Sequence, residues 1–162
     1  MNDAHLETLA EIRGFFRAFQ WVNHKTNHGF RFQISLAPRN SDIQAAVASH
    51  FSDENPTHLS ITHVDDWRNL LTKTLIRWLL AYLNDGPAMG RLLDEYKSFS
   101  LSLPCFYDDM INPLIEQIES LSPIQSAHTI TVKTDEFYAC DYTDIVLVAS
   151  DHLVFLHFHW SD

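Results

Sequence analysis

The chain has 162 residues, of which 46% are hydrophobic, and it carries a formal net charge of −10. This share of apolar residues excludes a disordered polypeptide, and a total of only four glycines argues against a turn-rich β-sandwich. The negative charge excludes nucleic acid and anionic membranes as partners, because proteins bind both mainly through lysine and arginine.

Apolar residues recur at three- and four-residue steps through much of the first two-thirds of the chain, a spacing that predicts amphipathic helices. In the first segment this spacing links Leu6, Leu9 and Ile12. A capping-box pattern at Ser41 and Gln44 predicts the start of the second helix. The predicted helices span residues 3–23, 42–51, 65–84, 87–97 and 112–121.

Strand patterns occur once near the N-terminus and then dominate the last 40 or so residues. Residues 30–36 alternate between apolar and polar side chains, which predicts a half-buried strand. The segment Leu59–Ile61 is compatible with a short strand or a loop. Residues 145–149 are apolar on both faces and indicate a central strand. The predicted C-terminal strands span residues 129–134, 137–142, 145–149 and 153–160.

Helices followed by strands indicate an α+β fold. We expect the mostly helical first two-thirds to pack on one face of a C-terminal antiparallel β-meander of four to five strands. Nothing divides the chain, so residues 1–162 are predicted to form a single globular domain. The N-terminus lacks the pattern of a signal peptide, and no apolar run is long enough to span a bilayer. We therefore expect a cytoplasmic protein.

Motifs of the common enzyme classes are absent from the sequence. There is no Gly-x-Ser-x-Gly elbow, no glycine-rich phosphate loop and no dinucleotide-binding fingerprint. The acidic pair Asp65–Asp66 has a structural explanation, because carboxylates favour a helix N-terminus. Our main hypothesis is therefore that the protein is not an enzyme and needs no cofactor.

Metal binding is the alternative hypothesis, because ten histidines are many for this length. His157 and His159 flank Phe158, and a strand would place the two imidazoles on one face, about 7 Å apart along the chain. Given further ligands, two such imidazoles could hold one ion and support a metal-dependent enzyme or a metal-binding protein. In the competing interpretation, both histidines simply occupy the more solvated face of the sheet.

The distribution of charge gives the strongest functional clue. Residues 1–100 carry eleven acidic and ten basic side chains, whereas residues 101–162 carry ten acidic side chains and only Lys133. Such a field attracts a basic partner and sets the orientation in which it docks. Tyrosines lie among these carboxylates and suit the centre of an interface. The predicted partner-binding residues are Asp135, Glu136, Tyr138, Asp141, Tyr142 and Asp144, with Asp108 and Asp109 as a flanking contribution.

In its size, acidity and α+β profile, the chain is similar to small bacterial immunity proteins, which neutralise a toxin by covering it with an acidic surface. The resemblance is one of type and attaches to no particular stretch of the sequence. It implies a basic protein partner, such as a toxin domain whose cleft binds nucleic acid. The sequence thus predicts an acidic inhibitor module with no nucleic-acid or membrane partner of its own.

Overall fold

The computed structural model describes residues 3–24, 29–39, 42–79 and 107–161. The helix predicted over residues 87–97 lies outside these ranges. Among the described helices, none is both long and apolar enough to cross a membrane.

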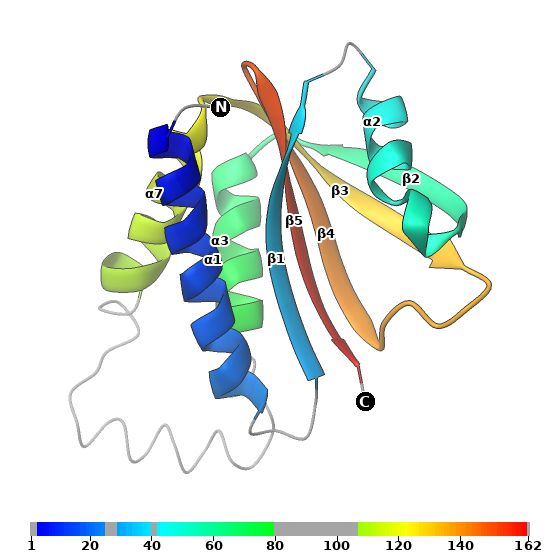
Figure 1. The fold of residues 1–162 in the computed structure, drawn as a ribbon, viewed down its shortest axis with the longest axis horizontal. Coiled ribbons are helices and arrows are strands. Elements are labelled where there is room, and N and C mark those ends of the chain that lie inside the picture. The colour runs from blue at the N-terminus through cyan, green and yellow to red at the C-terminus, as the bar shows by residue number, and fades with distance from the viewer. Residues whose placement is uncertain (1–2, 25–28, 40–41, 80–106, 162) are drawn as a thin grey trace.

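A five-stranded antiparallel sheet in the order β1-β5-β4-β3-β2 forms the centre of the fold (Figure 1). Its last three strands along the chain form a meander, and the two strands from the N-terminal half add to the two edges of this meander. The strands are β1 (Gly29–Pro38), β2 (Pro56–Val64), β3 (Ile124–Thr134), β4 (Asp141–Ala149) and β5 (His152–Ser161).

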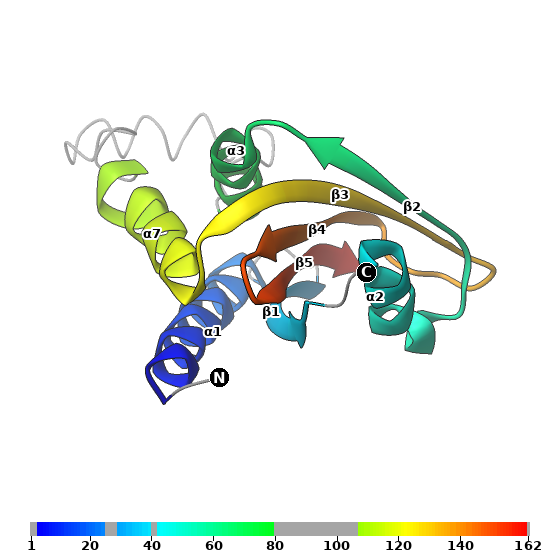
Figure 2. The same ribbon diagram turned by 90° about the horizontal axis from the view of Figure 1, so that it is seen from above.

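Three of the described helices cover one face of this sheet (Figures 1 and 2). Their apolar stripes supply Ile12, Leu75 and Ile118 to the main core, where they pack in one cluster with sheet residues such as Phe32 and Leu156. Every second residue of a strand points to this face, as the pleat requires. The helices are α1 (Asp3–Asn23), α3 (Trp67–Leu79) and α7 (Asn112–Leu121), the last preceded by the π-helical turn η3 (Tyr107–Ile111).

The opposite face carries α2 (Ile43–His50) and the short 3₁₀ helix η2 (Ser52–Glu54), as Figure 2 shows. Val47 and Phe51 belong to a second apolar cluster with Val146 and Phe155. Strands β4 and β5 are therefore covered on both faces over much of their length. This double cover explains why residues 145–149 are apolar without alternation.

The α+β fold class is confirmed, because the described helices all lie before residue 122 and three of the five strands of the antiparallel sheet lie after it. Two local predictions need correction, and one open alternative is decided. The cap of α2 is Asp42, whose carboxylate accepts a hydrogen bond from the Gln44 amide. The segment Leu59–Ile61, for which the sequence allowed a short strand or a loop, is part of a full edge strand, because β2 pairs with β3 along its length. The predicted strand 137–142 is wrong over residues 137–140, because residues 135–140 form the connection between β3 and β4, whereas residues 141 and 142 begin β4.

Candidate functional site

Two segments meet at the end of the sheet where β3 passes to β4. One is the connection of residues 135–140, and the other is η2 at the end of α2 (Figure 1). Pairing of Pro56 with Thr134 brings the segments together, and the Thr57 hydroxyl donates a hydrogen bond of 3.1 Å to the Lys133 carbonyl. Asn55 turns the chain between η2 and β2 with a positive φ of 47°.

Four exposed carboxylates lie on these two segments, and we call them the acidic rim. They comprise Asp53 and Glu54 on η2 together with Asp135 and Glu136 on the connection. Phe137 follows directly and is 69% exposed. Covering this phenyl ring with a partner would be favourable, because burial of an aromatic side chain removes a large apolar area from water. The end of the sheet thus presents an apolar anchor with negative charge beside it.

A chain of buried polar groups lies beneath the connection. The Tyr138 hydroxyl donates to Asp144 Oδ2 over 2.8 Å, and His157 Nδ1 lies 2.8 Å from Asp144 Oδ1. The other nitrogen of His157, Nε2, lies 2.8 Å from His50 Nε2. Asp144 is 2% exposed, and each of its carboxylate oxygens has a partner inside the protein. We call these four residues the buried polar chain.

The protonation of the buried polar chain follows from its burial. Desolvation, followed by the proximity of His157, lowers the pKa of His50 to about 4, against a partial opposing effect of Asp144. Desolvation also raises the pKa of Tyr138, and the Asp144 carboxylate raises it further. At neutral pH the His50 imidazole is therefore uncharged and Tyr138 keeps its proton. The His50 ring stacks on Phe155 with centroids 3.8 Å apart, which fixes its orientation.

The buried polar chain joins four separate pieces of the fold. His50 comes from α2, His157 from β5, Asp144 from β4 and Tyr138 from the connection. Both segments that carry the acidic rim are thereby tied to the central strands. A polar network whose members are all paired gives such a region a defined position. The buried polar chain is therefore the support on which the rim rests.

The residues predicted to bind a partner divide into three groups. Asp135, Glu136 and Tyr138 lie together on the connection. Asp141 pairs with Arg77 of α3, whereas Asp144 is buried and cannot touch a partner. The Tyr142 hydroxyl donates a hydrogen bond to the Val132 carbonyl. Asp108 and Asp109 are exposed in η3, on the helical side of the sheet and away from the connection (Figure 1).

The residues predicted to bind a partner did not include Asp53, Glu54, Phe137 or His50. Asp53 and Glu54 lie three and four residues after the last residue of α2, so an acidic pair shortly after a helix end was the available signal. Phe137 directly follows the predicted acidic turn at Asp135 and Glu136, but together with Tyr138 it was assigned to a strand, so its exposure was not predicted. His50 carried no such signal, because its partner His157 is 107 residues away along the chain.

The two histidines of the metal hypothesis point to the same face of β5 but make separate contacts. His157 belongs to the buried polar chain. The His159 ring stacks on Tyr138 with centroids 6.1 Å apart, and its pKa is lowered by burial and by the charge of Arg31. Within the described ranges, no three His, Cys, Asp or Glu side chains are arranged to hold one metal ion.

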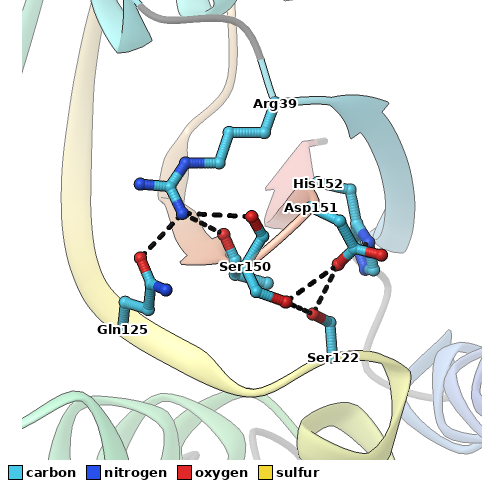
Figure 3. Close-up of polar contacts among 7 residues, drawn as sticks. Arg39, Ser122, Gln125, Ser150, Asp151 and His152 are labelled. Carbon is cyan, nitrogen blue, oxygen red and sulfur yellow. Dashed lines mark hydrogen bonds and ion pairs between the residues drawn. The ribbon is translucent and has the colours of Figure 1, made fainter.

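A second polar cluster closes the turn between β4 and β5 (Figure 3). Asp151 Oδ1 accepts hydrogen bonds from the hydroxyls of Ser122 and Ser150, at 2.6 and 3.2 Å. The Arg39 guanidinium donates to the Ala149 carbonyl over 2.7 Å. His152 Nδ1 lies 3.1 Å from the same oxygen, Asp151 Oδ1. Ser122 therefore meets a carboxylate and not an imidazole, so the cluster lacks the base contact that activates a serine nucleophile.

Comparison with models of protein families, with curated proteins and with solved structures gives no match for this chain. Its function must therefore be argued from the geometry of its own residues.

Proposed function

We propose that the chain is an acidic protein-binding module that docks on a basic partner through the acidic rim and Phe137. The exposure of Phe137, at 69%, is the observation that carries the proposal. Aromatic anchors dominate binding energy when a partner buries them, and surrounding polar groups then exclude water. Phe137 directly follows Asp135 and Glu136 along the chain, so a partner that covers the ring also meets their negative charge.

The partner should be basic, because the rim gathers four exposed carboxylates at one end of the sheet. Asp53, Glu54, Asp135 and Glu136 are all exposed, and Lys133 is the only lysine or arginine after residue 100. Complementary charge speeds encounter and fixes orientation more than it adds affinity. Association should therefore slow as salt rises, because screening shortens the reach of the rim.

The buried polar chain supports the proposal through preorganisation. Tyr138 follows Phe137 and is held by Asp144, and His50 anchors the helix that leads into η2. A surface that is already ordered loses less conformational entropy when a partner binds. Less of the free energy gained from contacts with the partner is then lost in ordering residues 135–140.

A toxin with a basic, nucleic-acid-binding cleft is the partner that suits this chemistry best. Carboxylates can occupy the positions in which lysine and arginine of such a cleft would meet phosphates. Inhibition in this immunity-type role would be steric and electrostatic and would need no cofactor. The chemistry required of the partner is a positive cleft with an apolar recess for one aromatic ring.

Affinity capture with a matched pair of charge reversals tests the proposal. We expect the native chain to retain a basic protein from a lysate of the source organism at low salt and to release it at high salt. The double variant Asp135→Lys/Glu136→Lys and the variant Phe137→Ala should both lose that protein. The control Asp108→Lys/Asp109→Lys makes the same change in net charge on the helical side and should retain it.

The location of the binding surface is refuted if both double variants behave alike. Equal loss would show that only the total charge matters, and equal retention would show that the rim does not bind. If the native chain retains no basic protein under any salt condition, the proposed function itself is wrong.

A further inference from the structure

Strand β2 forms one outer edge of the sheet, and no described element lies along its outer side (Figure 2). Side chains of α1 contact the strand at the other edge, β1. Arg13 donates a hydrogen bond of 3.2 Å to the Ile34 carbonyl. Gln20 donates one of 3.1 Å to the Phe30 carbonyl. The two edges thus differ, and β2 is the one that offers its backbone as a template for a further strand.

The register of the sheet shows which backbone groups of β2 point outward. In an antiparallel ladder, successive residues direct their N–H and C=O groups to the two neighbouring strands in turn. The Lys133 carbonyl of β3 faces β2, because it accepts a hydrogen bond of 3.1 Å from the Thr57 hydroxyl. The backbone groups of Val132 therefore face β4, where its N–H and its carbonyl both meet the Tyr142 hydroxyl.

Leu59 pairs with Val132, so the N–H and C=O of Leu59 point away from β3. The same holds for Ile61 and His63, because the register does not shift again along this part of β2. Among the described residues, none forms a backbone hydrogen bond with these outward groups. The outer edge of β2 therefore presents a row of alternating donors and acceptors.

Most of β2 lacks the features that keep an edge strand from pairing. Such features are charged side chains, above all lysine, together with prolines and bulges. Pro56 and an irregular register lie at the start of the strand. The remaining residues, His58–Val64, are regularly paired and include no Lys, Arg, Asp, Glu or Pro. This uncharged stretch is about 20 Å long, enough for an added strand.

Acidic residues flank the uncharged stretch on both sides. Asp53 and Glu54 of η2 precede it, and both are exposed. Asp65 and Asp66 follow it and are exposed as well. A second copy of this chain, paired antiparallel about a two-fold axis, would bring Asp65 of one copy toward Asp53 of the other, and like charges would repel. A segment with a basic residue at each end would meet opposite charge at both ends.

The two faces of β2 differ in polarity, and this difference selects the side chains of an added strand. Leu59 and Ile61 are partly buried and pack against the apolar cluster of α2, β4 and β5. Ser60 and Thr62 lie on the other face, as the pleat requires. Because neighbouring side chains on one face contact each other, an added strand should alternate apolar and polar residues.

We propose that the outer edge of β2 binds an extended segment of a partner protein, which pairs with the backbone of Leu59, Ile61 and His63. The segment has alternating apolar and polar side chains and a lysine or arginine at each end. Main-chain hydrogen bonds supply the affinity, and the flanking charges select the segment. The inference shares two carboxylates with the acidic rim but needs neither Phe137 nor a toxin, so it does not depend on the proposed function.

Amide hydrogen exchange of the full chain, followed by NMR, tests the pairing. The probe is the end-capped peptide Lys-Arg-Thr-Val-Thr-Val-Thr-Lys-Arg, and its matched control has Glu in place of every Lys and Arg. At saturation, exchange at the amides of Leu59, Ile61 and His63 should slow at least about tenfold. The amides of Ser60 and Thr62 should change little, because they already pair with β3. The control peptide should bind at least about tenfold more weakly.

Two variants at one position separate the backbone from the side chain. His63→Pro removes an outward N–H and no bond of the ladder, which an edge strand tolerates, and it should weaken binding of the peptide at least about tenfold. His63→Thr removes the same imidazole but keeps the N–H, so it should bind like the native chain. Phe137→Ala should also bind like the native chain, which separates this site from the proposed docking surface.

The proposal is overturned if the peptide causes no saturable change, if exchange slows away from β2 instead, or if the control peptide binds as tightly. It is also overturned if folded His63→Pro binds as tightly as His63→Thr. The exchange pattern of the native chain decides the matter even if the proline variant does not fold. If the native chain sediments as a dimer and the three outward amides are protected without peptide, the occupant is a second copy and the proposal is wrong.

Discussion

Acidification should weaken the attachment of α2 to the sheet through His50. Burial depresses the pKa of this imidazole from 6.5 to about 4. Because the folded pKa lies below the unfolded one, the unfolded chain binds the proton more readily. The stability contributed by neutral His50 is therefore fully present above about pH 6.5, and it is lost progressively as the pH falls from there toward 4.

The size of the effect follows from the two pKa values. At about pH 5 an unfolded imidazole is almost fully protonated, whereas only about one folded molecule in ten carries that proton. The free energy of unfolding is therefore lower at this pH than at neutral pH by about 2 kcal/mol. The ring is only partly buried and remains in contact with water, so we expect a loss of about 1–2 kcal/mol. A proton added to His50 would lie beside the rings of Phe155 and His157 on β5 and near the Asp144 carboxylate on β4.

Urea unfolding of the native chain and of His50→Gln, at about pH 7.5 and about pH 5, measures this loss. Glutamine can still donate to His157 but does not titrate, so groups that do not interact with residue 50 contribute equally to both proteins and cancel. The native chain should lose about 1–2 kcal/mol more than the variant between the two pH values. His58→Gln, at an exposed position, should keep the native pH dependence. Identical pH dependence of native chain and His50→Gln would refute the reasoning.

Two further variants test the supports around the acidic rim and α2. Tyr138→Phe leaves a buried oxygen of Asp144 without its donor and should lower the free energy of unfolding, measured in urea, by about 1–3 kcal/mol. Tyr142→Phe is the control and should lower it less, because the Tyr142 hydroxyl donates to a backbone carbonyl. If Tyr138→Phe costs no more than Tyr142→Phe, the role of the buried polar chain is contradicted. Asp42→Ala removes the side-chain cap of α2 and should cost about 1 kcal/mol in the same assay, and an unchanged midpoint would show that the cap hydrogen bond contributes nothing.

Periodicity was sufficient to predict the regular elements with strong apolar patterns. The main core is built from helix stripes such as that of α7 and from alternating strands such as β1, and both patterns are local in the sequence. Edge strand β2 was harder to recognise because its side chains are mostly polar and only partly buried. Its strand conformation comes from pairing with β3, which no local pattern reports.

The connection between β3 and β4 was misread for a different reason. Phe137 and Tyr138 are aromatic residues that favour strands, and their intrinsic preference predicted a strand over residues 137–142. In the structure, the Tyr138 hydroxyl reaches Asp144, six residues further along, and stays with it inside the protein. That contact requires the chain to leave the sheet and fold back over it. A tertiary hydrogen bond therefore overrides the local preference.

The excess of acidic residues in the last part of the chain also needs a structural correction. Asp144 is inside the protein, Asp141 meets Arg77, and Glu119 meets Arg68, so these carboxylates have structural partners. Sequence counting treats all of them as equal contributors to a surface field. Pairing removes some of them, and the folding of η2 adds Asp53 and Glu54 from the nearly neutral first part of the chain. The electrostatic surface that a partner would meet is therefore assembled by the fold and cannot be read from the charge of any one segment.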